Sequence, residues 1–159
     1  MDKQELIDMI LGDDPTKIPK WMRLFEDKVW VPKYNMDWKE TRDEPMKKLL
    51  AVKNSGLVSV KDFINNPKNI FLAHELIAQL DGSTVTKFTV HYNLFGGSIV
   101  ALHTDRHKHL FDIIDKYDIF GCFCLTELGY GNNAVKMETT VTYDEAAKEF
   151  IVNSPTVLS

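Results

Sequence analysis

The strongest constraint on the fold is a change of sequence pattern close to Asp118. Before this residue, apolar side chains recur at the spacing of amphipathic helices. After it, apolar and polar residues alternate or form short aromatic-rich runs, as they do in strands. The sequence therefore predicts an α+β chain with two domains, an all-helical N-terminal domain over residues 1–117 and the start of a β domain over residues 118–159.

Glycine, proline and capping residues divide the helical part into segments. Thr41 with Glu44 fits a capping box, and Ser83 or Thr84 is a candidate cap for a later helix. We expect helices that end at Gly12, that run from Thr41 to just before Gly56, from Pro67 to Gly82, from Val85 to Leu102 and from Asp105 to Tyr117.

The predicted helix from Val85 to Leu102 is apolar on most sides and should be central and buried. Gly96 and Gly97 inside it cost roughly 1 kcal/mol each relative to alanine. Such a cost suggests that a neighbouring helix or a ligand approaches this helix closely.

Three strands are predicted in the second part. Residues 119–126, IFGCFCLT, form a short apolar run typical of a buried strand, and residues 135–143 alternate as a half-buried strand does. A third strand, 150–153, follows a turn. Three strands close neither a barrel nor a sandwich, so we expect an incomplete β-barrel domain and a truncated chain.

Charge and hydropathy exclude several classes of protein. The net charge is −4, with acidic and basic residues interleaved, which argues against a nucleic-acid partner. No apolar run approaches the roughly 20 residues of a membrane span, and the N-terminus lacks a signal-peptide pattern. Cys122 and Cys124 are too close for an unstrained disulfide, so we interpret them as thiols in a reducing compartment. We expect a soluble intracellular protein.

His103, Asp105, His107 and His109 have a spacing that resembles a metal site. Only residues three or four apart share a helix face, so these four side chains cannot converge on one ion. We interpret the segment as a solvated helix start, in which Asp105 favours the positive end of the helix, and expect no metal.

Residues 121–133, GCFCLTELGYGNN, combine a predicted strand with a loop that contains Gly129 and Gly131. These glycines allow close approach of the backbone to a ligand, and Thr126 offers a hydroxyl where the loop begins. The same pattern is also that of a simple turn.

This segment, followed by METTVTYDEAAKEFIVNSPT, closely resembles the strand and loop that open the middle β-domain of acyl-CoA oxidases, a branch of the acyl-CoA dehydrogenase family. The upstream stretch LFGGSIVALHTDRHKHLFDIID resembles the last helices before that domain. The resemblance is specific from Leu94 to Thr156 and looser back to Trp30. It implies a helical N-terminal domain, a β-barrel middle domain and C-terminal helices.

The resemblance also implies an FAD-dependent enzyme of fatty acid β-oxidation. In that family a carboxylate removes the α-proton of a fatty acyl-CoA, flavin N5 accepts the β-hydride, and molecular oxygen reoxidises the flavin with release of hydrogen peroxide. The implied partners are fatty acyl-CoA, oxygen and a second subunit in a homodimer. The implied location is the peroxisome for a eukaryotic oxidase and the cytoplasm otherwise.

The resemblance assigns cofactor contacts residue by residue. Thr126 matches the threonine whose hydroxyl and backbone N–H meet the pyrimidine edge of the flavin, where fixed donors stabilise the charge that reduction builds. Phe123 and Leu125 match positions that border the isoalloxazine ring, although barrel packing explains them equally well. Gly131 matches a close-approach position. Asn132 stands where many relatives carry serine, near the FAD diphosphate or the bound acyl-CoA.

Phe95 and Gly96 match the border of the acyl-chain tunnel, which helix packing also explains. We expect Glu127 to be structural, because the family's catalytic glutamate comes from the C-terminal domain, which these residues do not include. No catalytic residue is therefore predicted here, and the chain alone is expected to be inactive.

Two alternatives stay open. The first is an acyl-CoA dehydrogenase that passes electrons to a carrier flavoprotein, although TELGYGNN is closer to the oxidase pattern than to the T-E-P-x-A-G-S-D form common among dehydrogenases. The second is a degenerate, non-catalytic oxidase-like interaction module, which Asn132 and the missing C-terminal domain favour.

Overall fold

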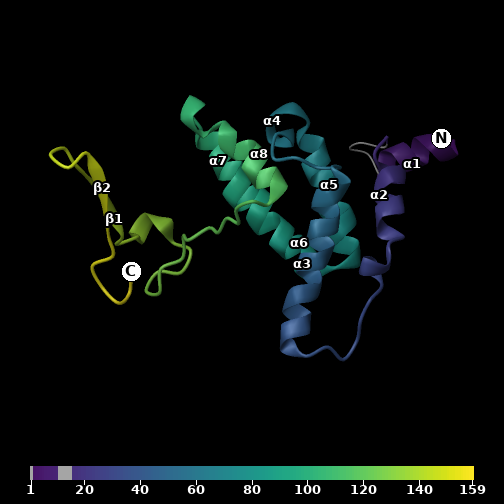
Figure 1. The fold of residues 1–159 in the computed structure, drawn as a ribbon, viewed down its shortest axis with the longest axis horizontal. Helices are drawn as coiled ribbons and strands as arrows, with labels where there is room; N and C mark the ends of the chain where they lie inside the picture. Colours follow the sequence, from purple (N-terminus) through teal and green to yellow (C-terminus); the bar gives the residue numbers. More distant parts are fainter. Residues whose placement is uncertain (1, 11–15) are drawn as a thin grey trace. The chain divides into compact units, whose positions relative to one another are not determined.

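The computed structural model describes residues 2–10 and 16–159, and its chain divides into two compact units. Residues 1–122 form a helical unit, and residues 123–159 form a second unit that contains the strands (Figure 1). The predicted helix end at Gly12 lies outside the described residues. Mostly helical structure followed by two antiparallel strands confirms the predicted α+β class.

Helices of very different lengths make up the first unit (Figure 1). Its elements are α1 (Lys3–Ile10), α2 (Ile18–Phe25), the 3₁₀-helix η1 (Lys28–Trp30), α3 (Trp38–Ser55), α4 (Asp62–Asn65), α5 (Pro67–Leu80), α6 (Gly82–Phe88), the π-helix η2 (Thr89–Gly96), α7 (Gly97–Leu102), the 3₁₀-helix η3 (Asp105–His107) and α8 (His109–Lys116).

The longest helix, α3, begins one turn earlier than predicted. Its capping box is formed by Asp37 and Glu40: the Asp37 carboxylate accepts the backbone N–H of Lys39 at 2.8 Å and of Glu40 at 2.9 Å. The predicted box at Thr41 was wrong, because the Thr41 hydroxyl lies inside the first turn and donates to the Asp37 carbonyl. The predicted end is confirmed by Gly56, whose φ of +63° is a left-handed cap.

The predicted helix from Val85 to Leu102 is present as three consecutive helical segments, α6, η2 and α7. Its cap is Asp81, which accepts the Thr84 backbone N–H at 2.8 Å, so the predicted caps at Ser83 and Thr84 were wrong. The π-helix in the middle was not predicted. Such segments are rare and are frequent at functional sites.

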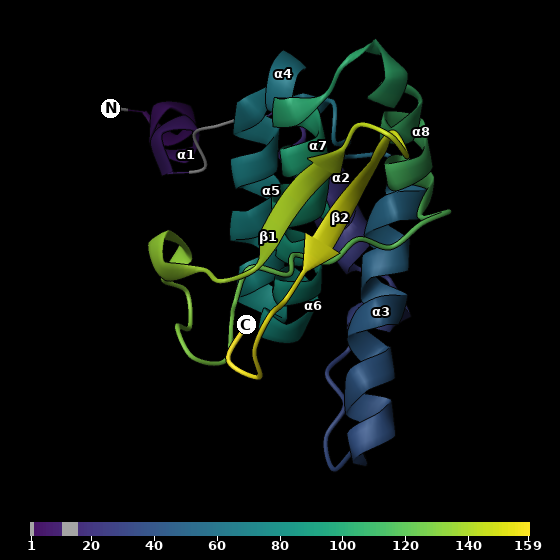
Figure 2. The ribbon, with the colours of Figure 1, turned by 90° about the vertical axis from the view of Figure 1, so that its left-hand side faces the viewer.

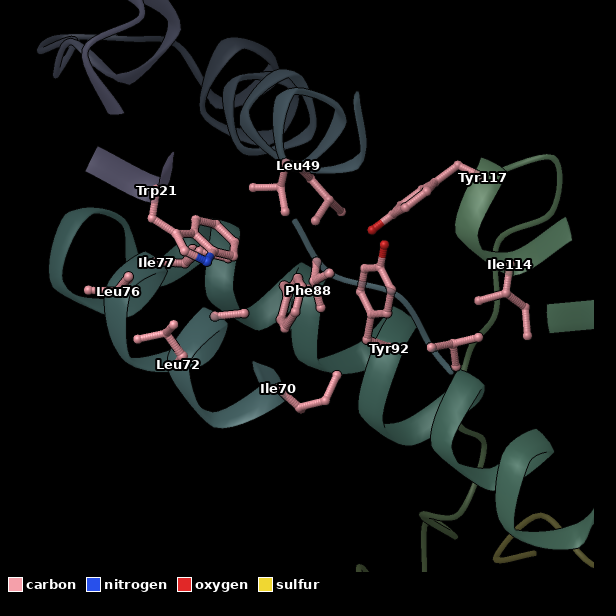
Figure 3. Close-up of a cluster of buried hydrophobic side chains, with 14 of the residues drawn as sticks. Trp21, Leu49, Ile70, Leu72, Leu76, Ile77, Phe88, Tyr92, Ile114 and Tyr117 are labelled. Atoms are coloured by element: carbon pink, nitrogen blue, oxygen red, sulfur yellow. The ribbon is translucent and has the colours of Figure 1, made fainter. Parts of the chain in front are cut away.

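The core of the helical unit lies where α3 and α5 pack on α6, and where α8 packs on η2 (Figure 3). The rings of Phe88 and Tyr92 pack in a tilted arrangement at its centre, with centroids 4.7 Å apart. Figure 3 shows the hydroxyls of Tyr92 and Tyr117 directed toward each other. Fully buried side chains in this core include Trp21, Leu49, Val52, Val60, Leu72, Ile77, Phe88, Tyr92 and Ile114.

The second unit contains a hairpin of β1 (Thr140–Asp144) and β2 (Glu149–Asn153) (Figure 2). The strands are antiparallel, with Thr140 opposite Asn153 and Asp144 opposite Glu149. The Asp144 carboxylate holds the turn by accepting two backbone N–H groups. The predicted third strand is thus confirmed. The predicted middle strand is shorter than expected, because residues 134–136 form the 3₁₀-helix η4 (Ala134–Lys136).

The predicted strand at residues 119–126 was wrong. A strand requires a hydrogen-bonded neighbour along its length, and within the described residues β1 and β2 pair only with each other. Two residues near the start of the run make contacts within the helical unit. Phe120 packs against Tyr117 with centroids 5.7 Å apart, and Gly121 lies so close to the Phe95 ring that a Cβ atom there would overlap it.

Candidate functional site

Residues 126–132 form a closed loop in the second unit. The Thr126 hydroxyl donates to Asn132 Oδ1 at 2.7 Å. Backbone bonds join Glu127 and Gly131 in both directions, at 3.2 Å and 2.8 Å. Gly131 has a φ of +57° and nothing within 4 Å of its would-be Cβ, so the turn geometry rather than crowding requires glycine there. The structure therefore brings together three of the residues predicted to contact the cofactor.

Glu127 fixes this loop to the segment that leads into β1. Its two carboxylate oxygens accept the backbone N–H groups of Glu138 at 2.8 Å and Thr139 at 2.9 Å. Desolvation opposes ionisation of this buried side chain, but the two N–H donors outweigh it and lower the Glu127 pKa. Glu127 is an anionic anchor in this structure, as the structural role expected for it requires.

A second carboxylate, Glu138, links the loop to the C-terminal segment. It accepts the Thr156 hydroxyl at 2.6 Å and the Tyr130 hydroxyl at 2.5 Å, and these two bonds lower its pKa. The hydrogen bond between Tyr130 and Glu138 also raises the pKa of Tyr130. Sequence reasoning missed Glu138 because it occupies an ordinary polar position of an alternating strand pattern.

The backbone at Gly129 lies directly against the C-terminal segment. Its N–H donates to the Leu158 carbonyl at 2.8 Å, and a Cβ atom at Gly129 would lie 2.8 Å from the Leu158 Cβ. A side chain at this position would displace the segment. The close approach that the sequence suggested for Gly129 is therefore made by the chain itself.

Phe123 and Leu125 lie directly before the loop in the sequence. Phe123 is 47% exposed, and Leu125 is half-buried. Thr126 and Asn132 are exposed as well. An aromatic side chain, a hydroxyl and an amide are thus presented along one short segment, which is a set suited to a planar heteroaromatic group with polar edges. Their role as cofactor contacts stays a prediction.

Phe95 and Gly96, the two residues predicted to border the substrate, lie in the π-helix of the helical unit. The Phe95 ring covers Gly121, and a Cβ atom at Gly96 would come within 2.7 Å of Val60 Cγ2. Close packing between η2 and the segment before α4 is therefore what requires glycine at residue 96. The predicted role of Phe95 and Gly96 in binding substrate stays a prediction.

The histidine-rich stretch at residues 103–109 is held by local hydrogen bonds. His103 Nδ1 lies 2.6 Å from the Val100 carbonyl, and His107 Nδ1 accepts the Thr104 backbone N–H at 3.0 Å. Across residues 2–10 and 16–159, no group of three or more histidine, cysteine, aspartate or glutamate side chains could hold a metal ion. Within the same residues, no helix is both long enough and apolar enough to cross a membrane.

The known proteins that are similar to this chain include acyl-CoA oxidases. No protein-family model matches the chain. Acyl-CoA oxidase 2 of Arabidopsis thaliana, named as peroxisomal, is 35% identical over 105 residues, which are 65% of this chain and 15% of that protein. Peroxisomal acyl-CoA oxidase 3 of Homo sapiens is 35% identical over 98 residues, 62% of this chain and 14% of that protein. The chain thus spans about one seventh of the length of these relatives.

Solved structures give the same result for the fold. Acyl-CoA oxidase 3 of Yarrowia lipolytica superposes with a TM-score of 0.76 at 26% identity, over 98% of this chain and 23% of that one. Acyl-CoA oxidase 1 of the same organism gives a TM-score of 0.73 at 27% identity, over 92% of this chain and 22% of that one. The resemblance to acyl-CoA oxidases is therefore confirmed over most of the chain, in sequence and in structure.

Proposed function

We propose that this chain is the N-terminal part of an FAD-dependent acyl-CoA oxidase of fatty acid β-oxidation, which converts acyl-CoA and oxygen to trans-2-enoyl-CoA and hydrogen peroxide. The observation that carries the proposal is the agreement of sequence and structure with acyl-CoA oxidases across both units. The Arabidopsis thaliana and Homo sapiens relatives are named as peroxisomal, which supports the peroxisome as the location.

The residues of the loop fit an FAD group. Thr126 and Asn132 supply exposed polar groups that are joined by a hydrogen bond, so the Thr126 hydroxyl would have to turn away from Asn132 Oδ1 before it could donate to FAD. Phe123 supplies an exposed aromatic face, with Leu125 beside it in the chain, and Gly131 leaves the backbone uncovered. When bound, FAD would supply the acceptor for the substrate's β-hydride. The role of Glu127 is to hold the loop in place while it contacts the cofactor.

Phe95, Gly96 and Asn132 are the proposed contacts to the acyl-CoA substrate. We expect the carboxylate base that removes the α-proton to come from a part of the enzyme outside these 159 residues. Glu127 is committed to two backbone N–H groups and Glu138 to two hydroxyls, and both pKa values are lowered, so neither is adapted to take up a proton near neutral pH. The 159 residues alone should therefore neither hold FAD tightly nor oxidise acyl-CoA. We propose that the whole enzyme is a homodimer.

The decisive assay uses the longer protein that carries this sequence. It should be yellow when purified, and addition of a fatty acyl-CoA should consume oxygen and release peroxide. Thr126→Ala should lower flavin content or the rate of flavin reduction, whereas Thr142→Ala, an exposed threonine on β1, should leave both unchanged. Reduction of the flavin without oxygen uptake, but with electron transfer to a dye, would instead indicate a dehydrogenase.

The non-enzymatic alternative rests on the hairpin. Val141, Phe150 and Val152 are each more than 60% exposed, so both strands present apolar side chains that a partner could cover. A colourless protein that forms a stable complex through this hairpin and shows no oxidation of acyl-CoA would support the interaction module and overturn the oxidase.

A further inference from the structure

An almost wholly apolar pocket lies between α4, α5 and η2 in the helical unit. The helical run of α6, η2 and α7 packs on α5 through α6 and on α4 through α7, and the pocket lies beside η2 between these two contacts. Its volume of about 350 Å³ falls within the range of roughly 300–1,000 Å³ that is typical of small-molecule sites. Its lining residues are Phe63, Pro67, Ile70, Phe71, His74 and Asn93.

The wall of this pocket offers carbon to a ligand rather than hydrogen bonds, since polar atoms form only a small part of its surface. His74 is already engaged: Nδ1 lies 2.7 Å from the Ile70 carbonyl and Nε2 lies 2.9 Å from the Thr89 hydroxyl. Because a carbonyl oxygen can only accept, Nδ1 carries the proton and Nε2 accepts from Thr89. Asn93 Oδ1 is buried, and Pro67 has no backbone N–H to donate. A polar group placed here would lose its hydrogen bonds to water without replacement.

Two phenylalanine rings form opposite kinds of wall. Phe63 is half-buried and lies against α7, where a Cβ atom at Gly97 would be 3.5 Å from its ring, an ordinary contact distance. Phe71, by contrast, is 64% exposed on α5, although Ile70 next to it is buried. An exposed aromatic ring loses free energy to water that contact with an apolar ligand would recover. The pocket thus has one packed aromatic wall and one that faces solvent until a ligand covers it.

The pocket is separate from the position proposed for the substrate at Phe95 and Gly96. Asn93 and Phe95 are two residues apart in η2, and residues at this spacing point to different sides of a helix. The Phe95 ring covers Gly121, whereas Asn93 lines the pocket together with residues of α5. A molecule in this pocket would therefore not occupy the position proposed for the substrate.

We propose that this pocket binds the alkyl chain of an amphiphile, such as a fatty acid or a lipid, whose polar head group stays in solvent beyond Phe71. The wall recognises the chain by burial of apolar surface and provides nothing for the head group. Affinity should therefore follow chain length, with an increase of about fourfold for each methylene buried, and not the charge of the head group. The site goes beyond the proposed function and does not depend on it, because it needs no flavin and includes none of the residues proposed to contact substrate.

Hexanoate, octanoate and octyl glucoside separate the effect of the chain from that of the head group. The full 159-residue chain, with ¹³C-labelled isoleucine methyl groups, is titrated with each compound below its critical micelle concentration and observed by NMR. The Ile70 methyl group should shift in a saturable manner and show contacts to the ligand chain, whereas Ile151, exposed on β2, should not.

Two additional methylenes should make octanoate bind about 16-fold more tightly than hexanoate, and octyl glucoside should bind within about threefold of octanoate. The first comparison tests burial of the chain, and the second distinguishes a fatty acid from an uncharged lipid as the source of that chain. An Ile70 resonance that does not shift, equal shifts of Ile70 and Ile151, or an affinity set by the head group would overturn the proposal.

Phe71→Ala tests the location of the site. It removes the exposed wall, and because Phe71 lies mostly in solvent the fold should be retained. Octanoate affinity should fall about fivefold or more. Leu80→Ala is the matched control, since Leu80 is also exposed on α5 but lies outside this lining, and it should change the affinity by less than about twofold. An unchanged affinity in Phe71→Ala, or an equal loss in both variants, would refute binding in this pocket.

Discussion

Removal of the Asp81 carboxylate should destabilise the helical unit in two separable ways. Asp81 forms an ion pair with Lys48, and the two side chains are only 18% and 9% exposed. It also caps α6 through the Thr84 backbone N–H. Desolvation opposes ionisation of Asp81, but the bonds from Lys48 and Thr84 outweigh it and lower its pKa. The carboxylate is therefore charged and doubly engaged at neutral pH.

The size of the effect follows from these contacts. Removing one partner of a fully buried ion pair costs about 3–5 kcal/mol, and the residual exposure of Asp81 reduces this to about 2–3 kcal/mol. Loss of the cap adds about 1 kcal/mol. Asp81→Ala should thus lower the free energy of unfolding by about 3–4 kcal/mol, and Asp81→Asn, which keeps a capping oxygen, by about 1 kcal/mol less.

Urea denaturation followed by tryptophan fluorescence measures this directly, because all three tryptophans, Trp21, Trp30 and Trp38, lie in the helical unit. Asp43→Ala is the matched control. Its ion pair with Arg42 joins side chains that are both at least 60% exposed, so it should cost less than about 0.5 kcal/mol. The reasoning would be refuted if Asp81→Ala cost no more than this control, or if Asp81→Ala and Asp81→Asn were equal.

Three further predictions concern the loop and the core. Gly131→Ala should cost about 1–2 kcal/mol in stability of the second unit, because φ is +57° there, whereas Gly82→Ala, where the added Cβ meets nothing, should cost nothing measurable; equal denaturation midpoints would contradict this. The Glu127 pKa is lowered from 4.5, so its contribution is present above that pH and is lost as the pH falls through the lower folded-state value. Amide exchange at Glu138 and Thr139 should therefore accelerate in that acid range, and Glu127→Gln should remove this pH dependence. Leu72→Ala should cost about 2–5 kcal/mol by creating a cavity at a fully buried site, and a thermal denaturation midpoint unchanged from that of the original chain would rule this out.

The sequence predicted helices well wherever a local signal stood alone. Pro67 opens α5 and Gly56 closes α3 as expected, because the fixed φ of proline and the left-handed φ of glycine act locally. The start of α3 was misplaced because two overlapping segments satisfy the same capping pattern, Asp37 with Glu40 and Thr41 with Glu44. Local pattern alone could not choose between them.

The failed strand has a different origin. An apolar run such as residues 119–126 fits either a sheet or the surface of a helix bundle, and only tertiary contacts decide which it joins. In this fold Phe120, which stays 64% exposed, and Gly121 contact aromatic side chains of the helical unit, whereas residues 123–126 belong to the second unit. The π-helix was equally out of reach, since no residue pattern distinguishes it from an α-helix of the same composition.

The loop could be predicted in its parts but not in its connections. Thr126, Gly131 and Asn132 were each identified from the sequence, yet the bond between Thr126 and Asn132 depends on a turn whose dihedral angles no spacing rule specifies. The network around Glu138 joins residues 130, 138 and 156, so it arises only after the chain has folded back on itself.

The most direct test of the account is the flavin spectrum of the longer protein that carries this sequence, recorded before and after anaerobic addition of a fatty acyl-CoA. We predict an oxidised flavin band that bleaches on addition of substrate and returns on admission of oxygen with release of peroxide. Thr126→Ala should weaken the band or its bleaching, and Thr142→Ala should not. A protein that contains no flavin, or whose flavin is unaffected by any acyl-CoA, would contradict the account.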